Sequence, residues 1–87
     1  MFETLSEPVD VIASFVGDKM RPVRFRWRGR AIPVKEVTGH WVRREGATQL
    51  SHFSVQDPAS DNYELRYDPR NLSWTLMQAW TEEKRRP

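Results

Sequence analysis

The sequence predicts an all-β fold, a small antiparallel five- or six-stranded barrel or roll of SH3-like type that is built of hairpins. Three observations support this prediction: apolar and polar residues alternate along several short segments, turn residues separate these segments, and no segment has the apolar spacing of a helix of normal length. A chain of 87 residues has room for one domain only. We therefore expect a single domain over residues 1–87, with flexible ends at 1–8 and 82–87.

The most regular segment is 23–28, in which Val, Phe and Trp alternate with three arginines. Such alternation is typical of a strand with one face in a core and the other in water. A two-residue turn at 28–29 gathers the apolar residues of the following segment on the same side. It pairs Trp27 with Arg30, Phe25 with Ile32 and Val23 with Val34.

The apolar residues then move from even-numbered positions, at Ile32 and Val34, to an odd-numbered position, at Val37. We expect a bulge or bend near Lys35–Glu36 that re-aims this strand. Pro22 and Pro33 both fall at positions that are not hydrogen-bonded within the first hairpin. Their missing N–H donors therefore point away from it, which a sheet tolerates at an edge or a bulge.

A second hairpin is predicted at 63–67 and 72–76. A four-residue loop at 68–71, which contains Pro69, keeps the apolar residues on one face. It pairs Tyr67 with Leu72, Leu65 with Trp74 and Tyr63 with Leu76. Two further strands are expected at Val9–Val16 and Leu50–Gln56, the latter with Phe53 and Val55 on one face, and polar loops are expected at 44–49 and 57–62.

The composition excludes several classes of protein. Cysteine is absent, which excludes disulfide scaffolds, thiol catalysis and cysteine-ligated zinc and fits a reducing compartment. The longest nearly apolar stretch, Val11–Val16, is far too short to cross a membrane, which takes roughly 20 residues. The N-terminal segment carries Glu3 and Glu7 rather than the features of a signal peptide. We therefore predict a cytoplasmic protein without membrane contact.

The sequence indicates neither a catalytic nor a metal centre. Its two histidines, His40 and His52, lack the spacing of metal ligands, and its four glycines are scattered singly rather than gathered in a phosphate loop. Folding can bring His52 near Asp57 or Asp61, but nothing in the spacing requires it. We predict a protein that is not an enzyme, with no catalytic residues, no metal and no cofactor.

The basic strand is the one feature that indicates a binding surface. Arg24, Arg26 and Arg28 are expected to project from one face about 6.5–7 Å apart, twice the rise per strand residue and close to the phosphate spacing of a nucleic-acid strand. An arginine fork binds a phosphate through two hydrogen bonds. Arg21 and Arg30 extend the charge around the turn.

A solvated strand face explains the same arginines, because a half-buried strand needs polar residues on its outer side. Acidic residues facing the arginines across the sheet would also neutralise them. The candidates for such pairing are Glu36, Glu64 and Asp68.

The tryptophans need separate interpretations. Trp27 and Trp74 fall on predicted core faces, so packing explains both. Trp41, close to Arg43, is either a core residue or an exposed ring that stacks on a base. The candidate nucleic-acid-binding residues are therefore Arg21, Arg24, Arg26, Arg28, Arg30, Trp41 and Arg43.

Two kinds of partner remain open. The first is the phosphate backbone of a nucleic acid, whose binding would weaken steeply with salt. The second is a protein partner, or a second copy of the chain, held at an exposed sheet edge or in an aromatic groove around Trp41. Pro22 and Pro33 lack backbone N–H donors and therefore disfavour the addition of a strand at one edge of the sheet. Any added strand is expected at the other edge.

Three segments of the chain carry a resemblance to a known family: "RPVRFRWRGRAIPVKEVTGHWVRREG", "HFSV" and "YELRYDPRNLSWTL". They resemble a small uncharacterised bacterial β domain, and the shared pattern covers roughly Arg21 to Trp80. That domain occurs alone or at the C-terminus of catalytically inactive relatives of Y-family DNA polymerases, which belong to mutagenic repair cassettes. The resemblance implies an association with DNA repair and brings no functional residues with it. Its carriers are core and turn residues: Phe25, Trp27, Gly29, Trp41, Phe53, Tyr63, Leu65, Asp68, Pro69 and Trp74.

Overall fold

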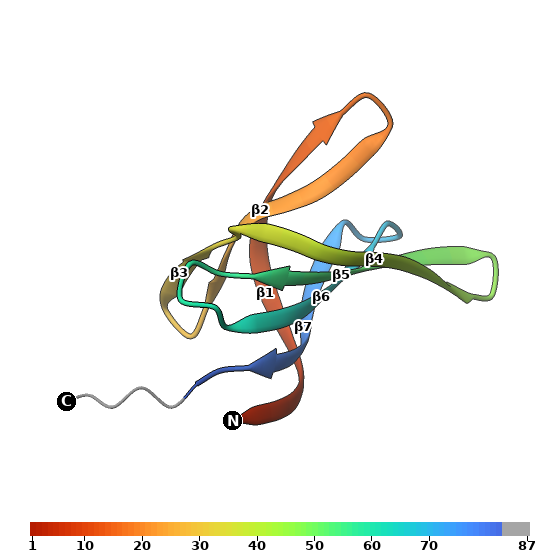
Figure 1. Ribbon diagram of the computed structural model, residues 1–87. Coiled ribbons are helices and arrows are strands. Elements are labelled where there is room, and N and C mark those ends of the chain that lie inside the picture. The colour runs from red at the N-terminus through yellow and green to blue at the C-terminus, as the bar shows by residue number, and fades with distance from the viewer. Residues whose placement is uncertain (83–87) are drawn as a thin grey trace.

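The computed structural model describes residues 1–82, which form one antiparallel sheet and contain no helix (Figure 1). Its strands are β1 (Phe2–Val16), β2 (Lys19–Trp27), β3 (Arg30–Pro33), β4 (Glu36–Glu45), β5 (Thr48–Gln56), β6 (Asn62–Asp68) and β7 (Ser73–Trp80). Their order in the sheet is β3-β2-β1-β7-β6-β5-β4. The predicted all-β class is therefore confirmed, whereas the closed barrel is not, because the sheet is open with β3 and β4 at its two edges.

A sharp bend explains why the sheet has seven strands rather than five or six. Val34 donates its N–H to the carbonyl of Val23 in β2 at 2.9 Å, and the next residue, Lys35, donates to the carbonyl of Gln56 in β5 at 2.7 Å. The chain thus changes its neighbouring strand within one residue, and the segment expected as one bent strand is divided into β3 and β4. The predicted bend near Lys35–Glu36 is confirmed, and it rolls the sheet so that its two edges meet at this corner.

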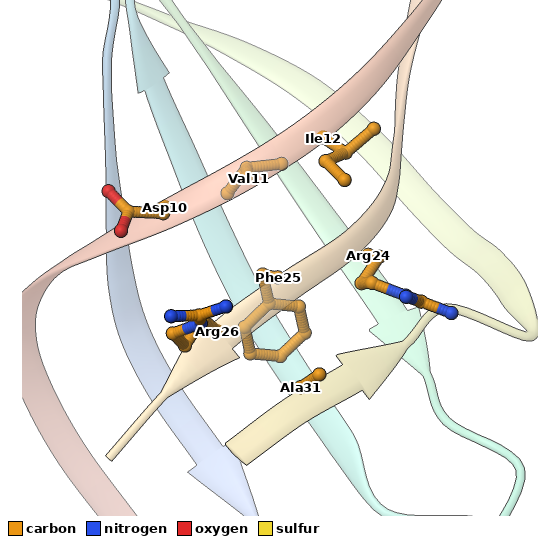
Figure 2. A pocket seen from close by; sticks show the side chains of 7 residues that line it. All are labelled: Asp10, Val11, Ile12, Arg24, Phe25, Arg26 and Ala31. Atoms are coloured by element: carbon orange, nitrogen blue, oxygen red, sulfur yellow. The ribbon is translucent and has the colours of Figure 1, made fainter. Parts of the chain in front are cut away.

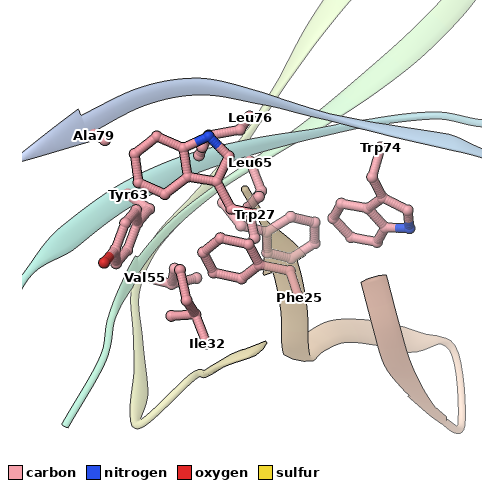
Figure 3. Packing of buried hydrophobic residues seen from close by; sticks show 10 residues of the cluster. Phe25, Trp27, Ile32, Val55, Tyr63, Leu65, Trp74, Leu76 and Ala79 are labelled. Carbon is pink, nitrogen blue, oxygen red and sulfur yellow. The ribbon is translucent and has the colours of Figure 1, made fainter. Parts of the chain in front are cut away.

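The core lies inside the roll, where β2 and β3 pack against β5, β6 and β7 (Figure 3). Tyr63 of β6 is the central contact: its ring lies edge-on to Phe25 at 5.2 Å and to Trp27 at 6.1 Å between centroids. The predicted core positions of Trp27 and Trp74 are confirmed. The buried apolar cluster consists of Phe25, Trp27, Ile32, Phe53, Val55, Tyr63, Leu65, Trp74, Leu76 and Ala79.

The first hairpin has the predicted register. Trp27 lies opposite Arg30 and Phe25 opposite Ile32. Arg28 and Gly29 both have positive φ, 51° and 77°, which is the backbone of a type I′ turn and matches the twist of the strands.

The expected core position of Val23 is wrong. The β1–β2 register shifts between Ile12 and Ala13, so that β2 carries one extra residue at this point. This bulge buries Pro22 on the core face and leaves Val23 41% exposed. Pro22 lies on the interior strand β2, opposite Ala13 of β1, so the expectation that it blunts an edge of the sheet is wrong.

The second hairpin keeps the predicted apolar face but not the predicted register. Leu65 lies opposite Leu76 rather than Trp74, and the four-residue loop runs over 69–72 instead of 68–71. The Asp68 carboxylate explains the shift, since its Oδ1 accepts a hydrogen bond from the backbone N–H of Arg70 at 3.0 Å. Leu72, expected in a strand, closes the loop with a φ of 56° and is 74% exposed.

The N-terminal segment is a strand rather than the expected flexible end. β1 begins at Phe2, not at Val9, and its first residues pair with β7, with Phe2 opposite Trp80. The expected polar loop at 44–49 is also wrong, because only 46–47 separate β4 from β5, and the expected loop at 57–62 ends one residue earlier, at Asp61.

The expected flexible end at 82–87 falls mostly outside the described residues. Glu82 itself donates its N–H to the carboxylate of Asp61 at 2.9 Å. Residues 83–87, with the basic cluster at 84–86, are not described. Within residues 1–82 the structure has no helix that is long and apolar enough to cross a membrane.

Candidate nucleic-acid interface

Three of the predicted arginines lie exposed along β2. Arg21, Arg24 and Arg26 project from its outer side. The extra residue at the Val23 bulge lets Pro22 face the core as Phe25 and Trp27 do, so the arginines next to these residues face outward. Across the sheet, Arg24 lies opposite Ile12 and Pro33, and Arg26 lies opposite Asp10 and Ala31. Among residues 1–82, no carboxylate oxygen lies within 4.0 Å of these three guanidinium groups.

Arg24 and Arg26 border a hollow of about 330 Å³ on this outer face (Figure 2). Ala31 of β3 and residues of β1 also line this hollow. Asp10 is the one acidic residue in its lining. Two guanidinium groups beside an open hollow form a surface that fits an anionic oxygen group such as a phosphate.

Arg28 does not belong to this array, contrary to the prediction. With a φ of 51° it leaves the strand alternation, and its guanidinium lies over the Trp27 ring at 4.5 Å. It donates to Glu7 Oε2 at 3.0 Å, and Glu3 lies 3.9 Å away. Glu7 also accepts a hydrogen bond from Trp27 Nε1 at 2.8 Å.

The pKa shifts of Glu7 and Arg28 agree with the contact between these two side chains. The hydrogen bond from Arg28, followed by that from Trp27, holds the pKa of Glu7 below its usual value. The same hydrogen bond raises the pKa of Arg28. Arg28 is therefore paired with carboxylates of β1, unlike Arg21, Arg24 and Arg26.

The remaining predicted residues lie elsewhere. Arg30 lines a separate hollow with Asp61 and Glu82, on the side of the roll near the end of β7. Trp41 and Arg43 lie on β4, at the opposite edge of the sheet from β3. The structure therefore brings together Arg24 and Arg26, with Arg21 further along the same strand. Arg28 and Arg30 line the second hollow together, and Trp41 and Arg43 lie apart from both groups on β4.

The three acids named above as candidate partners of the basic strand do not neutralise it. Glu64 Oε2 lies 2.9 Å from His52 Nδ1. Asp68 binds Arg70 at 2.8 Å, and this pair holds the pKa of Asp68 down to about 2, mainly through the side-chain hydrogen bond. Glu36 has no cationic nitrogen within 4.0 Å among residues 1–82.

The His52–Glu64 pair is a feature that the sequence patterns did not predict. It lies on the outer face of β5 and β6 beneath Trp41, whose ring stacks on His52 at 5.5 Å with 15° between the planes. Trp41 is 37% exposed and borders a hollow that Trp80 also lines, so it is not a core residue. The β5–β6 register places His52 diagonal to Glu64, and apolar alternation alone does not fix that register. In the part of the chain that the structure describes, no group of three metal-ligating side chains forms.

Asp57 and Asp61 hold the β5–β6 loop rather than pairing with His52. Asp57 Oδ1 accepts hydrogen bonds from the N–H groups of Ala59 and Asp61, both at 2.9 Å, and its Oδ2 accepts one from the Tyr63 hydroxyl at 3.0 Å. Burial, with Asp57 as the next cause, raises the pKa of Tyr63. These contacts are explained by loop structure alone.

Comparison of the chain with protein-family models, with curated proteins and with solved structures found no match.

Proposed function

We propose that this protein is a non-enzymatic accessory module that contacts the phosphate backbone of a nucleic acid through the outer face of β2. The observation that supports the proposal most directly is the pair of exposed, unneutralised arginines, Arg24 and Arg26, that borders an open hollow. Arg21 adds a third cation on the same strand. The family resemblance adds an association with DNA repair to this proposal.

The number of available cations sets the expected strength of binding. Three arginines neutralise at most three phosphates, and Asp10 opposite Arg26 reduces the local potential. Each neutralised phosphate of duplex DNA contributes about 0.9 to the slope of log K against log salt concentration. We therefore expect weak, sequence-independent binding at low salt, which is the behaviour of an accessory contact rather than of a sequence-reading protein.

Fluorescence anisotropy with labelled single-stranded and duplex oligonucleotides at low salt tests the proposal. The variant R24S/R26S should lose at least about tenfold in affinity, since charge-assisted hydrogen bonds contribute roughly 1.5–3 kcal/mol each. The matched control is R43S/R44S, which removes the same charge from β4 and should bind within about twofold of the unaltered protein. Equal losses in both double variants would show a response to net charge only and would refute the proposed site.

A further inference from the structure

β4 is an edge strand with an open outer side. Its ten residues contain no proline, and within residues 1–82 no strand pairs with it except β5. The opposite edge, β3, has only four residues and ends in Pro33. A row of unpaired backbone N–H and C=O groups is a template for another extended chain, so the two edges differ in their capacity to accept one.

The β4–β5 register shows which amides of β4 are free. Glu45 lies opposite Thr48 across the two-residue turn at 46–47, so these two residues form a hydrogen-bonded pair. Hydrogen-bonded and non-hydrogen-bonded pairs alternate along an antiparallel ladder. The N–H groups of His40, Val42 and Arg44 therefore point away from β5, towards the open side of the edge.

This open side borders a groove of about 890 Å³, which we name the mouth of the roll. β2 and β4 diverge from each other in the ribbon (Figure 1). The mouth is lined by residues of both strands and by Lys35 of the corner between β3 and β4. Its apolar lining consists of Val16, Met20, Val37 and Phe53. The His40 ring lies parallel to the Phe53 ring at 4.4 Å. A strand paired with β4 would turn every second side chain towards this lining.

The charges that line the mouth favour a partner segment with an acidic residue. Its lining carries a small excess of positive charge: Lys19, Arg21 and Lys35 against Asp18 and Glu36. We propose that an extended segment of a protein partner adds to the free edge of β4, with apolar side chains at alternate positions turned into the mouth and an acidic residue towards Lys19 and Arg21. This inference shares Arg21 with the proposed nucleic-acid contact, but the backbone pairing along β4 does not involve Arg24 or Arg26.

Selection from a random twelve-residue peptide library displayed on phage supplies the probe for this proposal. A selected peptide, synthesised with blocked ends, is titrated against the unaltered protein, V42P and V42A. Val42→Pro removes one outward N–H and places a ring on the open edge, while the β4–β5 ladder keeps its hydrogen bonds. We expect V42P to bind at least about tenfold more weakly and V42A to bind within about threefold.

A second measurement keeps the test valid if V42P folds poorly. Hydrogen exchange in the unaltered protein should show that the bound peptide protects the amides of His40, Val42 and Arg44. Failure to select any peptide, equal binding by V42P and V42A, or protection at another surface would overturn the proposal. A dimer of the free protein that V42P dissociates would also overturn it, because the occupant of the edge would then be a second copy of the chain.

Discussion

The carboxylate of Glu7 lies 3.0 Å from the guanidinium of Arg28, although the two residues are 21 positions apart. The same carboxylate accepts the indole N–H of Trp27 at 2.8 Å. This contact removes one arginine from the basic strand and fixes the orientation of a core ring. Glu7 lies within β1, in a segment that was expected to be a flexible end.

The Glu7 contact predicts a pH-dependent stability difference. The folded pKa of Glu7 is lowered, so its charge stabilises the fold at pH values above the ordinary glutamate pKa of about 4.3, and this contribution is lost as the pH falls through the folded value. We expect E7Q to melt below the unaltered protein at pH 7 and the difference to narrow towards pH 3. Thermal unfolding followed by circular dichroism measures both. E36Q is the control, and equal melting temperatures of E7Q and the unaltered protein at pH 7 would contradict the assignment.

The packing of the core predicts that truncation of Leu65 strongly lowers the free energy of unfolding. Its side chain is fully buried between β5 and β7, and truncation to Ala leaves a cavity. We expect L65A to lower the free energy of unfolding by about 2–5 kcal/mol in urea titrations. The exposed Leu72 provides the comparison, and L72A should change stability by no more than about 0.5 kcal/mol. Similar effects of the two substitutions would mean that the hairpin register is wrong.

The hydrogen bond between Asp57 and Tyr63 predicts an energetic coupling. In D57A the buried Tyr63 hydroxyl loses its acceptor, which costs roughly 1–3 kcal/mol, whereas in Y63F the hydroxyl itself is absent. A double-mutant cycle of D57A and Y63F should therefore give a coupling energy of about 0.5–3 kcal/mol. Additive effects of the two substitutions would show that Asp57 acts only on the backbone of its loop.

The turn of the first hairpin predicts different effects for two glycine substitutions. Gly29 has a φ of 77°, so a Cβ at this position is strained, and we expect G29A to cost about 1 kcal/mol. A Cβ at Gly39 would make ordinary contact with Ser54 Cβ at 3.6 Å, with no positive φ. G39A should therefore be the milder change in urea titrations, and the reverse order would contradict the I′ turn.

Sequence patterns predicted much of the fold because side chains alternate strictly between the two faces of a strand. A slip of one residue would have turned Phe25 and Ile32 to water, so only one register of the first hairpin was consistent with a core. In the second hairpin, two registers that differ by two residues keep the same face. Apolar alternation could not separate them, and the turn at Asp68 determined the outcome.

The candidate site was predicted less completely. Exposure of Arg24 and Arg26 follows from alternation and is confirmed. The neutralisation of Arg28 does not follow, because it depends on a long-range pairing of β1 that brings Glu7 across the sheet. Trp41 and Arg43 were grouped with the arginines by composition, and the sheet order separates them.

The salt dependence of nucleic-acid binding tests the central proposal most directly. A plot of log K against log salt concentration for duplex DNA should have a slope of about −2 to −3 for the unaltered protein. R24S/R26S should reduce the magnitude of this slope by about 2, and R43S/R44S should leave it unchanged. A slope that is the same in all three proteins, or binding that does not weaken with salt, would contradict a phosphate contact through Arg24 and Arg26.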